Sequence, residues 1–125
     1  MKKIDIKTSK LPKTWLIDLD GTIIQHNSHL VEKNILLKGV KKFWKKISKV
    51  DKIVILSARP EKYKKSTISF LKRNSLRFDH IIFNLNVGER LLINDKKPDG
   101  LKTSISINVK RNDGLENIII KNKKN

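Results

Sequence analysis

Residues 16–24 read LIDLDGTII, in which an apolar run ends in two aspartates that flank one leucine. The continuous apolar run over residues 14–19 predicts a buried parallel strand. Residues two apart in a strand point to the same face, so Asp18 and Asp20 are expected to lie side by side. Two neighbouring carboxylates repel each other and resist desolvation, so the pair requires a partner that offsets its charge.

Several other segments have the pattern of a strand. A β-branched run predicts a strand at residues 52–58, and two further apolar runs predict strands at 80–83 and 90–94. Residues 103–109 alternate between apolar and polar side chains, which is typical of an edge strand with one face in water. Residues 115–120 fit either a strand or a short helix.

Two segments between these runs follow a helical period. In residues 29–49 one face is apolar and the other carries lysines; the apolar face consists of Leu36, Val40, Phe43, Trp44 and Ile47. In residues 60–74 a proline suits the first helical position, and the buried face is expected to contain Tyr63, Thr67, Phe70 and Leu71. Strands that alternate with helices predict an α/β fold, with a three-layer, Rossmann-like, mainly parallel sheet and helices on both of its faces.

Length and composition bound the class of protein. The chain has 125 residues and 38% hydrophobic content, which predicts a single domain over residues 1–125. No stretch approaches the roughly 20 apolar residues of a membrane span, and the N-terminus has no apolar secretory segment. We therefore expect a cytoplasmic protein with no membrane partner. The lack of cysteine excludes disulfides, thiolate metal sites and cysteine nucleophiles.

The net charge is +17, from 29 Lys and Arg against 12 Asp and Glu. One interpretation is a polyanionic partner such as nucleic acid. The other is coding bias, because the lysines are scattered and aromatic residues make up only 6% of the chain. The basic end, residues 121–125, is interpreted as a solvated tail without fixed structure.

Side chains suited to catalysis follow three of the expected strands. In chain order they are Asp18 and Asp20, then Ser57, Ala58 and Arg59, then Asp95 and Asp99. The carboxyl ends of parallel strands meet at one crevice, so these groups are expected to converge. Carboxylates are ligands of a hard cation, Mg²⁺ rather than zinc. Backbone amides at the start of a helix, beside Ser57, would cradle a phosphoryl group.

These motifs resemble those of the haloacid dehalogenase (HAD) superfamily of phosphohydrolases, in order and in placement at strand ends. The matching residues, spread over roughly residues 14–100, are Asp-Leu-Asp-Gly-Thr at 18–22, Ser57, and Asn-Asp-Lys-Lys-Pro-Asp at 94–99. The resemblance implies a Mg²⁺-dependent phosphomonoesterase that works through an aspartyl-phosphate. The motifs follow one another too closely for an inserted domain, so a small member without a cap is expected.

The resemblance also implies a role for each residue. Asp18 would be the nucleophile, Asp20 the general acid and then the base, and Thr22 would orient the nucleophile. The Mg²⁺ ion would be held by Asp18, by the backbone carbonyl of Asp20 and by Asp95, with Asp99 in support. The phosphate would be bound by Ser57, Ala58 and Arg59. Residues 22–24 would form a β-hairpin flap over the site.

The sequence departs from the family pattern at the lysine that usually pairs with the phosphoryl group. No lysine lies between Asp79 and Asp95, where Arg90 is the only cation. The candidates for this pairing cation are therefore Arg90, Lys64 and Lys65. Two nearby histidines, His26 and His29, are interpreted as surface residues.

The expected substrate is a sugar phosphate or another phosphorylated metabolite, because the chain resembles small phosphatases of sugar-phosphate and surface-polysaccharide pathways. Two alternatives stay open. One is a polynucleotide 3′-phosphatase, since the chain also resembles the phosphatase part of polynucleotide kinase-phosphatases. The other is a non-catalytic nucleic-acid-binding module on the same fold. The oligomeric state does not follow from the sequence.

Overall fold

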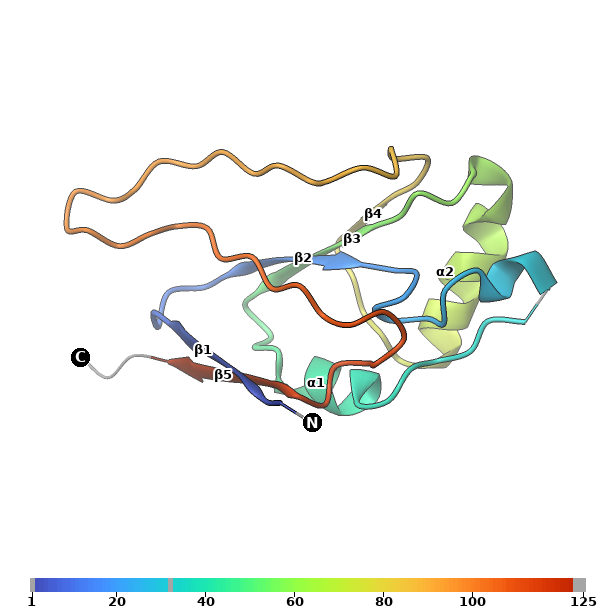
Figure 1. Cartoon of the computed structure of the whole chain (residues 1–125), viewed down its shortest axis with the longest axis horizontal. Helices are drawn as coiled ribbons and strands as arrows, with labels where there is room; N and C mark the ends of the chain where they lie inside the picture. Colours follow the sequence, from blue (N-terminus) through green and yellow to red (C-terminus); the bar gives the residue numbers. More distant parts are fainter. Residues whose placement is uncertain (1, 32, 123–125) are drawn as a thin grey trace.

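The structure is a computed structural model that describes residues 2–31 and 33–122 (Figure 1). It is an α/β fold, as predicted, and its strands lie in two small parallel sheets. The elements in chain order are β1 (Ile4–Thr8), β2 (Thr14–Asp18), the 3-10 helix η1 (Ser28–Val31), α1 (Val40–Lys46), β3 (Lys52–Leu56), the 3-10 helix η2 (Glu61–Tyr63), α2 (Lys64–Arg73), β4 (His80–Ile82) and β5 (Ile118–Asn122). None of the described helices is long and apolar enough to cross a membrane.

The larger sheet has the strand order β2-β3-β4, and every pairing in it is parallel. Asp18 pairs in register with Leu56, and Leu56 pairs in turn with Ile82. The residues that follow these three positions therefore leave the sheet at the same edge. This register places the loop after Asp18 beside the segment that begins at Ser57.

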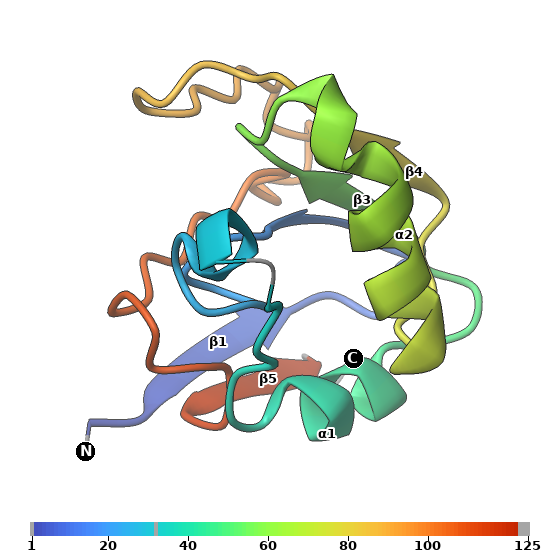
Figure 2. The same cartoon turned by 90° about the vertical axis from the view of Figure 1, so that its right-hand side faces the viewer.

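One face of this sheet is buried by both α-helices. Ile53 and Ile55 of β3 are fully buried, and they share one hydrophobic cluster with residues of α1 and with Leu71 of α2. Figure 2 shows α2 lying along the sheet. The opposite face carries Leu16 and Ile82, each about half exposed. Helices on both faces were expected, whereas both described α-helices pack on the same one.

The predictions for the core elements are confirmed in type. Strands were expected at 52–58 and 80–83, and β3 and β4 lie there with slightly shorter bounds. The helix expected over 60–74 consists of η2 followed by α2. Three of its four predicted core residues are buried, namely Thr67, Phe70 and Leu71, and Tyr63 is partly exposed.

The prediction of one long helix over residues 29–49 is wrong. Only Val40–Lys46 is α-helical, and a separate 3-10 turn covers Ser28–Val31. Gly39 lies directly before α1 in a left-handed conformation, with φ of 74°, so the helix cannot extend back through this residue. A Cβ atom at this glycine would lie 2.6 Å from the backbone nitrogen of Glu116, so the close approach of the C-terminal segment also requires glycine.

The predictions of strands at 90–94 and 103–109 are also wrong. Both segments lie in an extended arm, residues 86–108, that runs beyond the end of the sheet and returns (Figure 1). Leu91 and Ile93 are 88% and 93% exposed. Neither segment of the arm forms a ladder with a described strand, so their strand-like residues remain unpaired.

The smaller sheet joins the two ends of the chain. β1 pairs in parallel with β5, and the sequence did not predict β1. Residues 115–120 fitted either a strand or a helix, and β5 shows that a strand forms from Ile118 onward. β5 also contains residues 121–122, which were expected to belong to a solvated tail; residues 123–125 of that tail lie outside the described part of the chain.

Candidate functional site

Asp18 ends β2, and both of its carboxylate oxygens are engaged. The Thr22 hydroxyl donates to Oδ2 at 3.1 Å, and Arg90 Nη1 donates to Oδ1 at 2.7 Å. The Asp18 side chain keeps 38% of its exposure. This carboxylate is thus oriented by a neighbour, paired with a cation, and open to solvent at the carboxyl edge of the sheet.

A tight turn brings Thr22 back onto Asp18. The backbone N–H groups of Thr22, Ile23 and Ile24 all donate to the carbonyl of Leu19, at 3.3, 2.9 and 3.0 Å. Both isoleucines are fully buried and anchor the turn in the core. Residues 22–24 were expected to begin a β-hairpin flap over the site. Ile24 does form an antiparallel bridge with Leu36, as in a hairpin, but the side chains of Ile23 and Ile24 are buried in the core.

Asp20 forms a bidentate ion pair with Arg59. Arg59 Nε lies 3.2 and 3.0 Å from the two carboxylate oxygens, and Nη2 lies 2.8 Å from Oδ1. The Arg59 side chain is 0% exposed and that of Asp20 is 17% exposed. The planar guanidinium fork matches a carboxylate in this geometry, and the pairing offsets the cost of burying both charges.

The remaining Arg59 donors bind two further parts of the chain. Nη1 donates to the Thr67 hydroxyl at 2.8 Å, which connects Arg59 to α2. Nη2 also donates to the Asn34 side-chain oxygen at 3.0 Å. Arg59 was predicted to bind phosphate, whereas its guanidinium is engaged inside the protein. Neither Thr67 nor Asn34 was predicted to belong to the site, because neither lies in a recognisable motif.

His29 lies beside the Asp20–Arg59 pair and not at the surface, where it was expected. Its Nδ1 is 3.8 Å from Asp20 Oδ1, and its side chain is 9% exposed. Its ring packs edge-on against Tyr63, with centroids 4.6 Å apart. Burial lowers the pKa of His29 below its ordinary value, the Arg59 charge lowers it further, and Asp20 acts in the opposite direction.

Ser57 follows β3 and lies in the predicted place. It is buried, and its Oγ accepts a hydrogen bond from the Arg59 backbone N–H at 3.0 Å. Its own N–H donates to the Ile82 carbonyl at 2.9 Å, which extends the pairing of β3 with β4. Ala58 follows at the same edge, partly exposed. The ends of β2 and β3 therefore meet, as the sequence predicted.

The structure does not bring Asp95 and Asp99 to this edge. Both are exposed residues of the arm. The Asp95 carbonyl accepts a hydrogen bond from the Thr103 hydroxyl, and Asp99 Oδ1 accepts one from the Leu101 N–H at 3.0 Å. Within residues 2–31 and 33–122, no three His, Cys, Asp or Glu side chains lie together as a metal-binding group.

The three candidate pairing cations occupy different places. Arg90, at the base of the arm, contacts Asp18 directly. Lys64 and Lys65 line a groove along α2, and the ion pair of Asp18 within the described residues is with Arg90. The geometry therefore singles out Arg90 as the cation that faces Asp18.

Two acidic residues at the edge of the sheet, each paired with an arginine, form the candidate site. The outer pair, Asp18–Arg90, is half-exposed, and the inner pair, Asp20–Arg59, is shielded. Arginine has a long, flexible side chain, so Arg90 can exchange its contact with the partly exposed Asp18 carboxylate for a contact with an anionic ligand.

No family model, curated protein or solved structure matches the chain.

Proposed function

We propose that the chain is a phosphohydrolase of the HAD type, which transfers the phosphoryl group of a phosphomonoester to Asp18 and then to water. The observation that carries the proposal is the environment of Asp18: oriented by Thr22, half-exposed at the carboxyl edge of β2, and 2.7 Å from Arg90. The substrate class that we propose is a sugar phosphate or a similar phosphorylated metabolite.

The first step forms a bond between an Asp18 oxygen and phosphorus. The phosphorus–oxygen bond to the leaving alcohol breaks, and the alcohol oxygen takes up a proton. Arg90 would exchange its contact with Asp18 for the incoming phosphoryl oxygens, which frees the nucleophile and offsets the charge of the phosphate. Water then attacks the phosphorus of the aspartyl-phosphate, which releases inorganic phosphate and restores Asp18.

Asp20 is the proposed general acid and then the base that activates water. Both of its oxygens accept hydrogen bonds from Arg59, so one oxygen would first turn away from this contact and take up a proton from solvent, which it then gives to the leaving alcohol. The remaining bonds of Arg59, to Thr67 and Asn34, would hold the guanidinium in place while Asp20 turns.

The Mg²⁺ requirement belongs to the proposal. It is supported by the partly exposed Asp18 carboxylate at the edge of the sheet, because Mg²⁺ is commonly held by one or two carboxylates together with substrate phosphates and water. The Asp18 carboxylate and the Asp20 backbone carbonyl would hold it, with Asp95 and Asp99 as ligands only if the arm folds back. The ion would supply neutralisation of the phosphoryl oxygens.

A phosphate-ester screen tests the proposal. The wild-type protein is expected to release phosphate in the presence of Mg²⁺, and chelation is expected to abolish the release. Asp18→Asn should lower the rate by about 10³-fold or more, because it removes the nucleophile. The matched control is Asp5→Asn, at an exposed aspartate of β1. Equal rates for Asp18→Asn and wild type would refute the mechanism.

A non-catalytic binding module is the second candidate. It is favoured by one observation: Asp95 and Asp99, the other predicted metal ligands, lie on the arm and not beside Asp18. In that case the Arg90–Asp18 contact would be structural. Absence of turnover over the whole ester panel, with and without Mg²⁺, would support this candidate over the first.

A further inference from the structure

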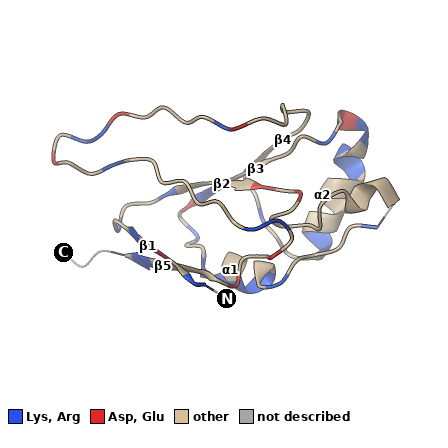
Figure 3. Cartoon of the chain, in the orientation of Figure 1, with Lys and Arg blue, Asp and Glu red and all other residues tan. Residues whose placement is uncertain are grey.

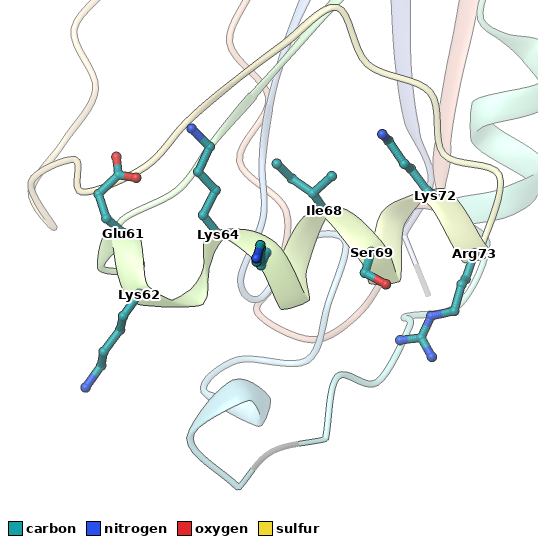
Figure 4. Close-up of a pocket in the computed structure, with 8 residues that line it drawn as sticks. Glu61, Lys62, Lys64, Ile68, Ser69, Lys72 and Arg73 are labelled. Carbon is teal, nitrogen blue, oxygen red and sulfur yellow. The ribbon is translucent and has the colours of Figure 1, made fainter.

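A groove of about 680 Å³ follows the outer side of η2 and α2 (Figure 4). Five cationic side chains line it, against one acidic side chain, Glu61; the cations are Lys62, Lys64, Lys65, Lys72 and Arg73. In Figure 3, Lys and Arg appear in blue along α2 and also on other parts of the chain, among them α1. This groove therefore carries a local excess of positive charge.

None of the five cations of the groove forms an ion pair within the described part of the chain. The ion pairs there involve other Lys, Arg and His side chains. Lys62 and Arg73 instead lie near the rings of Tyr63 and Phe70. An anion bound in the groove would consequently meet uncompensated positive charge.

The spacing along α2 suits a linear polyanion. Lys64, Ile68 and Lys72 are four residues apart in turn, so they follow one side of the helix, and Figure 4 shows them projecting together. A rise of about 1.5 Å per residue places Lys64 and Lys72 ~12 Å apart along the axis. Lys64 and Lys72 can therefore contact two separate phosphates of one extended chain, while Lys62 and Arg73 project to the other side of the helix (Figure 4).

The groove fits nucleic acid better than an anionic membrane. A helix that lies on a bilayer inserts an apolar face, but the apolar face of α2, with Phe70 and Leu71, is buried in the core. The groove is lined by no aromatic side chain, so it offers no platform for stacked bases. Contacts would be made with phosphates, which carry no sequence information.

We infer that this groove binds the phosphodiester backbone of a polynucleotide, independently of base sequence. The inference does not rest on the proposed phosphatase activity, because the groove and the Asp18 site share no residue. The inference distinguishes two interpretations of the net charge. A diffuse positive field would bind a polynucleotide equally well at any lysine-rich surface, whereas a specific groove would bind it at α2.

The test compares two double variants with equal loss of charge. Lys64→Glu with Lys72→Glu alters the groove, and Lys41→Glu with Lys45→Glu alters exposed lysines of α1. Affinity is measured by fluorescence anisotropy with a labelled single-stranded oligonucleotide that has no terminal phosphate. Binding is thereby read without any phosphate ester that the proposed enzyme would hydrolyse.

The α2 variant is expected to bind at least about tenfold more weakly than wild type, with a salt dependence shallower by about 2 in log–log slope. The α1 variant should stay within about threefold of wild type. Equal losses in the two variants would overturn the inference in favour of a diffuse field. Stronger binding to vesicles of phosphatidylserine and phosphatidylcholine than to the oligonucleotide, lost in the α2 variant, would overturn it in favour of a membrane surface.

Discussion

At the scale of the residue, Arg59 holds the candidate site together. Its guanidinium connects Asp20, Asn34 and Thr67, which belong to three separate parts of the chain. The sequence predicted the importance of Asp18 and Asp20 because a short motif carries them. It could not show that Arg59 turns inward, since that orientation depends on partners distant in sequence.

Replacing Arg59 should therefore destabilise the fold. Arg59→Met leaves the Asp20 carboxylate without its partner in a shielded place, and we expect a loss of about 3–5 kcal/mol in the free energy of unfolding. Urea denaturation measures this. Arg73→Met, at an exposed position of α2, is the control and should change the free energy by less than about 0.5 kcal/mol. Equal effects would contradict a central role for Arg59.

His29 should make stability depend on pH. Its pKa is lowered in the folded protein, so the unfolded chain binds a proton first as the pH falls. The stabilisation is therefore complete above the ordinary pKa of 6.5 and is lost as the pH falls through the lowered pKa of the folded state.

This dependence is measured as the free energy of unfolding at pH values from 7.5 to 5, roughly the range in which histidine titrates. His29→Gln should flatten the loss seen in wild type, and the control His80→Gln, at an exposed position, should leave it unchanged. A wild-type stability that rises as the pH falls over this range would contradict the assignment.

At the scale of the element, local pattern predicted the strands and helix that form the core. β2, β3 and β4 were found because each is a short apolar run, and α2 because its buried residues follow the helical period. The predictions failed where contacts between distant segments decide whether a strand forms. β1 forms by pairing with β5, whereas the arm has strand-forming residues but pairs with no described strand. Whether a segment with strand-forming residues becomes a strand depends on the strands beside it, and a single sequence does not show which segments those are.

The arm should contribute little to stability. Leu91→Asn with Ile93→Asn places polar side chains where the apolar ones are almost fully exposed, so we expect a change within about 0.5 kcal/mol per substitution. Ile55→Ala, at a fully buried position of β3, should cost about 2–5 kcal/mol. Chemical denaturation measures all three proteins. A loss above about 2 kcal/mol in the arm variant would mean that residues 90–94 pack as a strand after all.

At the scale of the whole molecule, the order of motifs predicted which strand ends would meet. The ends of β2 and β3 do meet, and they bring Asp18 and Asp20 beside Ser57 and Arg59. Asp95 was expected at the same edge because a strand was expected before it; without that strand it lies on the arm. The meeting of the β2 and β3 ends was thus predictable, whereas the place of Asp95 and the inward orientation of Arg59 were not.

The central claim is that Asp18 accepts a phosphoryl group. The direct measurement is mass spectrometry of protein quenched in acid during turnover of a phosphomonoester, with the peptide that contains Asp18 examined for one added phosphoryl group. We predict a hydroxylamine-labile phosphoryl group on Asp18 in wild type, and none in Asp18→Asn. Turnover of the ester without a phosphoryl group on Asp18, or with an equal amount on the variant, would contradict the account.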